Sequence, residues 1–136
     1  MQFMVFSDKF VDGVVAIDSQ HARLIEIINH LYAISLKRKP ITELDTVFDD
    51  LTAYTTEHFA YEEKLMAETG YPKAAEHRRH HDAVKKQIAD YRASVTSTNK
   101  TIIAAELLHF LKVRLVQHMT TDDKDACRHF NENGIK

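Results

Sequence analysis

The sequence predicts an all-α protein: an antiparallel, up-down four-helix bundle preceded by a non-helical N-terminal arm. Glycine and proline are scarce, with 3 Gly and 2 Pro among 136 residues, and turn-rich β architectures need more of both. Four segments repeat apolar residues at helical spacing, and the connections between them are short. One domain covering residues 1–136 accounts for the whole chain.

The first two helices are expected over residues 18–39 and 41–69. Asp18 or Ser19 provides an N-cap for the first helix, and Pro40 ends it. Gly70 ends the second helix. The arm before them, residues 1–17, contains several Phe and Val residues without a helical period, so we expect it to pack across the bundle.

The third and fourth helices are expected over residues 72–96 and 101–132. Pro72 suits the first turn of the third helix, which gives way to the polar stretch 94–100. The fourth helix contains a second polar stretch, residues 120–125, that we expect to bend or interrupt it.

Composition excludes several classes of function. The 18 Lys and Arg residues nearly balance the 20 Asp and Glu residues, which leaves no large positive field for nucleic acid or an anionic membrane. No apolar run approaches the roughly 18 residues of a membrane span, and no secretory signal is evident. The single Cys127 excludes an intrachain disulfide framework and a thiolate zinc cluster. We therefore expect a cytoplasmic protein.

Histidine is abundant, with 9 residues, and its placement is informative. Residues at i and i+4 lie about 40° apart on a helix, so both can face one point. His58/Glu62 and His77/His81 form two such pairs, and each pair interrupts an apolar stripe. With two further histidines on the apolar stripes of the first and fourth helices, the inward-facing set is His21, His58, Glu62, His77, His81 and His118.

A metal is the expected partner of these side chains, because burying unpaired polar groups costs about 1–3 kcal/mol each. Imidazole and carboxylate without thiolate suit iron, manganese, copper or zinc. The set exceeds one coordination shell, which favours two metals bridged by carboxylates. A further carboxylate is expected after His118. Helical spacing favours Asp122, about 40° from His118, over Asp123 at about 140°, with Asp125 a third choice.

The order of these residues resembles the hemerythrin family in its bacterial single-domain form. The resemblance covers nearly the whole chain. It is carried by Ile17-Asp18-Ser19-Gln20-His21, by His58-Phe59 through Glu62-Glu63, by His77 with His81, and by His118-Met119 followed by Asp123. It implies two non-haem irons joined by an oxide or hydroxide bridge.

The resemblance also implies a ligand set. One iron is bound by His77, His81 and His118, the other by His21 and His58, and Glu62 and Asp123 bridge them. The family's spacing thus selects Asp123 over Asp122, and we expect a helix widening or break between Met119 and Asp123 that turns this carboxylate inward. Phe6-Ser7 stands where the family usually has Trp-Ser, which affects the expected packing of the pocket rather than metal binding.

This ligand set leaves one coordination position open, on the iron with two histidines. The resemblance therefore implies reversible binding of O2 for carriage, storage or sensing, with nitric oxide or small anions as other ligands of the same position, and no enzymatic activity. One alternative is a di-iron oxidase or ferroxidase, or an enzyme that scavenges peroxide or nitric oxide. Another is an interaction module stiffened by a metal such as zinc.

The other polar residues near these motifs receive a structural interpretation. His30 and His109 are expected on the outer faces of their helices, and His80 lies off the direction of the His77/His81 pair. His129 lies too far along its helix to reach the site. Glu63 is expected to be solvated.

Overall fold

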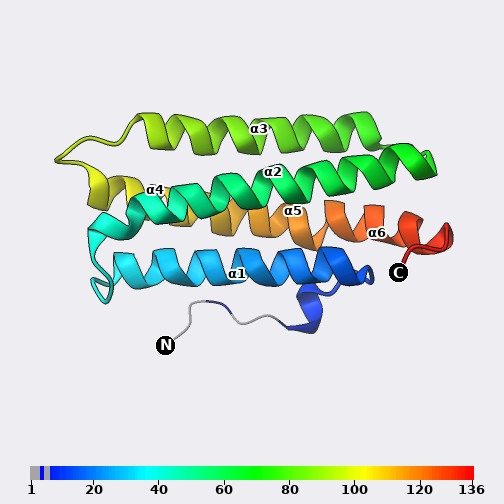
Figure 1. Cartoon of the computed structure of the whole chain (residues 1–136), viewed down its shortest axis with the longest axis horizontal. Coiled ribbons are helices and arrows are strands. Elements are labelled where there is room, and N and C mark those ends of the chain that lie inside the picture. Colours follow the sequence, from blue (N-terminus) through cyan, green and yellow to red (C-terminus); the bar gives the residue numbers. More distant parts are fainter. Residues whose placement is uncertain (1–3, 5–6) are drawn as a thin grey trace.

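The chain runs back and forth four times along one axis in the computed structural model, which describes residue 4 and residues 7–136 (Figure 1). Three passes are single helices and the fourth is a segmented rod. The elements are η1 (Asp8–Phe10), α1 (Val15–Ser35), η2 (Ile41–Glu43), α2 (Leu44–Thr69), α3 (Ala74–Ala93), α4 (Lys100–Phe110), η3 (Leu111–Leu115), α5 (Val116–Thr120) and α6 (Asp122–Glu132). No strand occurs within the described ranges. The predicted all-α, antiparallel four-helix bundle is confirmed.

The boundaries of α1 differ from the predicted ones. The helix begins at Val15 because Asp18 lies within its first turn instead of capping it. The Asp18 carboxylate accepts hydrogen bonds from the backbone N–H of Asp12, at 2.6 Å, and of Gly13, at 3.3 Å. Asp18 therefore fixes the turn that precedes the helix. At the other end α1 stops at Ser35, and Lys37 adopts a left-handed conformation with φ of 60°.

The remaining helices are shorter than predicted, and Pro72 lies before the first turn of the third helix and not within it. Gly70 ends α2 in the left-handed conformation, with φ of 64°, as its sequence position predicts. A turn of 3-10 helix, η2, precedes α2, so the regular helix begins at Leu44. The third helix covers Ala74–Ala93, inside the predicted range 72–96.

The fourth rod is interrupted where the sequence predicts it. Helix α5 ends at Thr120, Thr121 leaves the helical region with φ of −121° and ψ of −68°, and α6 begins at Asp122. The expected break between Met119 and Asp123 is therefore present. A separate widened turn of π-helix, η3, lies before His118, at a position that the sequence did not predict.

The apolar core is divided into two clusters. The large cluster fills most of the bundle and includes Leu24, Ile28, Phe48, Leu51, Leu107 and Leu111. The small cluster lies near the start of α1 and the end of α6 and consists of Val14, Ile17, Leu65, Met66, Tyr71, Ala126, Cys127 and Phe130. Along α1, the buried His21 lies between Ile17 of the small cluster and Leu24 of the large cluster. Along α2, Glu62 lies between Phe59 of the large cluster and Leu65 of the small cluster.

Two described residues of the N-terminal segment, Met4 and Phe10, contact the bundle. The backbone N–H of Met4 donates to Asn29 Oδ1 at 2.8 Å, and Asn29 Nδ2 donates to the Met4 carbonyl at 2.7 Å. Phe10, in η1, is buried against the large cluster. Phe6, which stands at the family's Trp position, lies outside the described residues.

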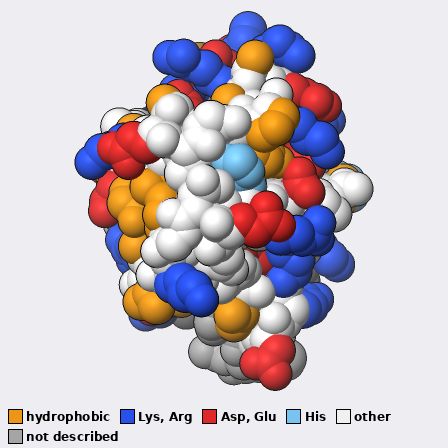
Figure 2. All heavy atoms as spheres, turned by 90° about the vertical axis from the view of Figure 1, so that its right-hand side faces the viewer, with side chains coloured by type: hydrophobic (Ala, Val, Ile, Leu, Met, Phe, Trp, Pro, Cys, Tyr) orange, Lys and Arg blue, Asp and Glu red, His pale blue; other side chains and the backbone are white. Residues whose placement is uncertain are grey.

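Acidic and basic side chains are both present on the end of the bundle where α1 begins and α6 ends (Figure 2). None of the described helices is long and apolar enough to cross a membrane.

Candidate metal centre

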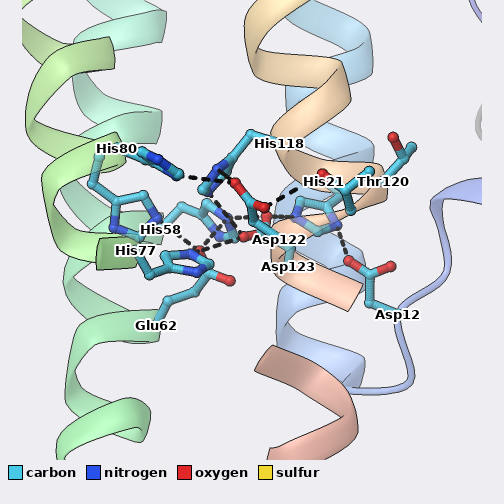
Figure 3. A network of polar contacts seen from close by, with 12 residues as sticks. Asp12, His21, His58, Glu62, His77, His80, His118, Thr120, Asp122 and Asp123 are labelled. Atoms are coloured by element: carbon cyan, nitrogen blue, oxygen red, sulfur yellow. Dashed lines mark hydrogen bonds and ion pairs between the residues drawn. The ribbon is translucent and has the colours of Figure 1, made fainter. Parts of the chain in front are cut away.

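Seven polar side chains form a continuous buried layer across the bundle (Figure 3). None is more than 6% exposed. The layer contains one residue from α1, two from α2, two from α3, one from α5 and one from α6: His21, His58, Glu62, His77, His81, His118 and Asp123. The structure thus brings together every residue that the sequence assigns to the site.

The Asp123 carboxylate lies between two groups of imidazoles. Its Oδ2 is 2.8 Å from Nε2 of His21 and 3.5 Å from Nε2 of His58. Its Oδ1 is 3.1 Å from Nε2 of His77 and 3.1 Å from Nε2 of His118. Each oxygen therefore faces a different group, which is the geometry of a carboxylate that can bridge two cations.

The Glu62 carboxylate also faces both groups. Its Oε1 is 3.2 Å from Nε2 of His58, 3.2 Å from Nε2 of His81 and 3.5 Å from Nε2 of His77. Glu62 and His58 come from α2, one turn apart, whereas the other two imidazoles come from α3.

The interruption of the helix at Thr121 determines which aspartate side chain enters the layer. Because α6 starts as a new helix after this residue, Asp123 turns inward and is 1% exposed. Asp122 remains one turn from His118, as helical spacing predicts, but its Oδ2 lies 2.9 Å from Nδ1 of that ring, on the outer side. Asp125 lies elsewhere and accepts a hydrogen bond from the hydroxyl of Tyr71.

Two sets of converging ligand atoms result. In each set the atoms lie within 4.8 Å of one another, and Asp123 belongs to both. One set comprises Glu62, His77, His81, His118 and Asp123, and the other comprises His21, His58 and Asp123. This arrangement can hold two metal ions that share a carboxylate.

Partners on the outer side orient the imidazoles. Three Nδ1 atoms are hydrogen-bonded: His58 to Gln20 Oε1 at 2.5 Å, His81 to Glu63 Oε2 at 2.9 Å, and His118 to Asp122 Oδ2 at 2.9 Å. A proton held at Nδ1 leaves Nε2 unprotonated and aimed into the layer, which is how metal-binding histidines are usually fixed.

The expectation that Glu63 is solvated is wrong, since it contacts His81. Sequence reasoning also missed the contacts of Gln20 and Asp12. These partners lie on other elements than the imidazoles that they contact, so no spacing along the sequence indicates them. The interpretation of three other histidines agrees with the structure: His30 pairs with Glu43, His129 contacts the Thr69 carbonyl, and His109 is exposed.

The hydrogen-bonding capacity of the layer is not satisfied by the described residues. Atoms without a hydrogen-bond partner include both oxygens of Glu62, Oδ1 of Asp123, and Nε2 of His77, His81 and His118. Buried polar atoms of folded proteins nearly always have a partner. Metal cations fit this donor set, because every one of these atoms can act as a ligand.

Charge in the layer also favours cations. Burial raises the pKa of Glu62 and Asp123, but the neighbouring imidazoles more than offset it and hold both pKa values below the usual range. Burial disfavours protonation of the histidines, yet the two carboxylates raise the pKa of His58 and of His77 to about 9. The same carboxylates, with Asp122, raise the pKa of His118 to about 10. Without metal, protons therefore occupy the layer.

Aromatic rings support two of the imidazoles. The ring of Phe59 is stacked on His81, with centroids 3.8 Å apart and planes at 5°. The ring of Tyr54 is stacked on His58 at 5.2 Å and 17°. These contacts restrict rotation of the rings and exclude water from their faces.

The four-helix bundle and its buried layer of histidines and carboxylates together define a class of protein, the helical bundles that bind metal ions in their core. A family model described as "Hemerythrin HHE cation binding domain" matches residues 12–127. The chain belongs to the hemerythrin family, as its motifs predict. Hemerythrins bind O2 at an iron site, so family membership and the histidine and carboxylate layer together indicate iron here.

Relatives of known description support the same family. A bacteriohemerythrin of Stenotrophomonas maltophilia is 38% identical over 126 residues, which cover 91% of this chain and 79% of the relative. One from Pseudomonas aeruginosa is 33% identical over 139 aligned positions, covering 100% of this chain and 89% of the relative. One from Clostridium acetobutylicum is 27% identical, covering 89% of this chain and 96% of the relative.

Proposed function

We propose that the layer holds two non-haem irons, joined by an oxide or hydroxide bridge, and that the protein binds O2 reversibly for carriage, storage or sensing. His77, His81 and His118 would bind one iron, His21 and His58 the other, and Glu62 and Asp123 would bridge them. Two ferrous ions held by these residues would supply the electrons that O2 accepts on binding and gives back on release.

The observation that carries this proposal is the unequal division of the imidazoles. Three imidazoles, those of His77, His81 and His118, converge with Glu62 and Asp123, whereas two, those of His21 and His58, converge with Asp123. If both carboxylates and a single-atom bridge are shared, the ion beside His21 and His58 has one protein ligand fewer than its neighbour. That position is open to O2 and, by the same chemistry, to nitric oxide or a small anion.

The surrounding residues favour binding over turnover. His21 and Glu62 are fully buried, so bulk water does not contact these two side chains. The shell contains five nitrogen ligands and only two carboxylates, whereas the di-iron and di-manganese carboxylate bundles carry a Glu on every helix. Fewer anionic ligands stabilise high-valent iron less. We therefore propose a binding protein rather than an enzyme, acting in the cytoplasm.

The visible spectrum of the reduced, iron-loaded protein tests this function. O2 is admitted under anaerobic handling and then purged, and the iron content per chain is measured. A colour that appears and disappears with O2 supports the proposal. Irreversible decay to a ferric product would favour an oxidase or a scavenging enzyme, and bound zinc without any colour would favour a structural module. A His109→Gln variant, altered at an exposed histidine of α4, serves as the matched control.

A further inference from the structure

A second group of potential metal ligands lies directly outside the buried layer. Nδ1 of His80 and Nδ1 of His118 both face Oδ2 of Asp122, at 3.1 and 2.9 Å (Figure 3). We call these three residues the outer triad. The side chain of His80 is 49% exposed and that of Asp122 39%, whereas that of His118 is only 5% exposed. The outer triad therefore connects solvent to a ring whose other nitrogen faces the layer.

Two surface cavities meet at the outer triad. One, of about 270 Å³, is lined by His80, Asp122 and the proposed iron ligand His77. The other, of about 220 Å³, is lined by His80, Asp122 and His118. Both cavities thus extend from solvent to imidazoles of the three-histidine group. The break at Thr121, which lines both cavities, places Asp122 on their surface and Asp123 inside the layer.

The charge of the larger cavity suits a cation. Three carboxylates line it, those of Glu76, Asp122 and Asp125, and a single ammonium group, that of Lys73, opposes them. A concave surface lined by one sign of charge concentrates ions of the opposite sign.

We propose that the outer triad is an entry site, at which a ferrous ion binds transiently before it moves inward to the two-iron centre. The inference rests on the proposed function, because it takes the buried layer as the destination. Two imidazole nitrogens and a carboxylate are suitable ligands for a divalent transition metal. Exposure of the triad leaves the remaining positions to water, so the ion can exchange quickly.

The outer triad also limits its own occupancy. While the layer is empty, a metal ion that displaces the proton from Nδ1 of His118 binds this nitrogen together with His80 and Asp122. Once Nε2 of His118 binds an inner metal, Nδ1 holds the proton and donates to Asp122, which orients the ring. The outer triad then loses one nitrogen ligand and is weakened as soon as the inner position is filled.

An entry site has a kinetic signature that a structural residue lacks. A group on the path speeds entry and exit equally and leaves the equilibrium affinity unchanged. A residue that only orients an inner ligand changes the affinity instead. Within the outer triad, His80 bonds to Asp122 and meets the His118 ring only edge-on, with centroids 6.2 Å apart, and no described hydrogen bond joins it to a residue of the layer. A change at His80 therefore separates the two roles.

The test uses the full-length, metal-free chain and Co²⁺, whose visible absorption reports its ligands. In the wild type the uptake rate should saturate with Co²⁺ concentration, because the ion first occupies the outer triad. In His80→Gln, we expect uptake and chelator-driven release to be slower by a similar factor, about five- to tenfold, with two metals still bound at the end. Wild-type metal content also checks the buried centre independently.

Two further variants serve as controls. His109→Gln removes an exposed histidine far from the cavities and should leave both rates unchanged. Glu76→Gln removes one charge from the larger cavity without altering the triad, and should slow uptake more at low than at high salt. Equal rates in His80→Gln and wild type would overturn the proposal. So would slower uptake with unchanged release, because that result means lower affinity.

Discussion

The carboxylate of Asp12 lies 3.4 Å from Nδ1 of His21, so the segment before α1 reaches the buried layer. The Asp12 side chain is itself fully buried, and Nζ of Lys124, on α6, lies 3.1 Å from its Oδ1. Burial raises the pKa of Asp12 to about 6, while His21 and Lys124 oppose the rise. Lys124 also donates to the carbonyl of Val11 at 2.8 Å, which ties this segment to the fourth rod.

Removing this carboxylate should loosen the metal beside His21. For Asp12→Ala we expect affinity for the more weakly held metal to fall about 10- to 100-fold, as for other residues that orient a metal-binding histidine. Equilibrium competition with a chelator measures it. Asp8→Ala, an exposed aspartate of the same segment, is the matched control. An unchanged affinity in Asp12→Ala would show that His21 is oriented without this contact.

The two carboxylates of the layer should be essential for binding a pair of metals. Glu62→Ala and Asp123→Ala each remove ligand atoms that face both imidazole groups, so we expect fewer than two irons per chain. Metal analysis after anaerobic loading measures this. Glu57→Ala removes an exposed glutamate of α2 and should retain both irons. Full occupancy in Glu62→Ala would contradict its bridging role.

The stability of the metal-free protein should decrease at alkaline pH. The pKa of His58, His77 and His118 rises from 6.5 in the unfolded chain to about 9 or 10 in the folded one. Their contribution is therefore complete below about pH 6.5 and is lost as the pH rises through 9 to 10. Urea denaturation at several pH values measures it.

The stability of the metal-free protein should also decrease at acid pH, and metal binding should depend on pH as well. The pKa values of Glu62 and Asp123 are lowered by folding, so their contribution is lost as the pH falls below the ordinary carboxyl range. Metal ions compete with protons for the histidines, so metal binding should strengthen as the pH rises. A metal-free protein that is equally stable at pH 6 and pH 10 would show that its histidines are unprotonated.

Cys127 should report the state of the site through its reactivity. Its thiol is fully buried in the small cluster, and burial raises its pKa well above the ordinary value. We expect slow labelling by a thiol reagent in the loaded protein and labelling at least about tenfold faster after metal removal, because local opening becomes easier. As the single cysteine of the chain, it gives one signal. Equal rates in both forms would mean that the metals do not stabilise this end.

Sequence reasoning located the layer because its members repeat along the chain. His58/Glu62 and His77/His81 are one turn apart, and such pairs are visible without any structure. The inward position of Asp123 was not accessible to spacing alone, since it depends on how the backbone turns at Thr121. The order of the family's motifs indicated it instead. Contacts such as Glu63 with His81 join different helices and therefore required the three-dimensional structure.

The polar layer between the large and small clusters has a consequence for cooperativity. Each cluster is an apolar unit of its own, and the layer joins them through protonated histidines or through metal ions. The metal-free chain should therefore contain two units of unequal resistance to hydrogen exchange, with backbone amides around Ile17, Leu65 and Phe130 exchanging through openings smaller than global unfolding. Metal binding in the layer would couple the two units, so that the backbone amides at both ends of the bundle exchange only through a common opening.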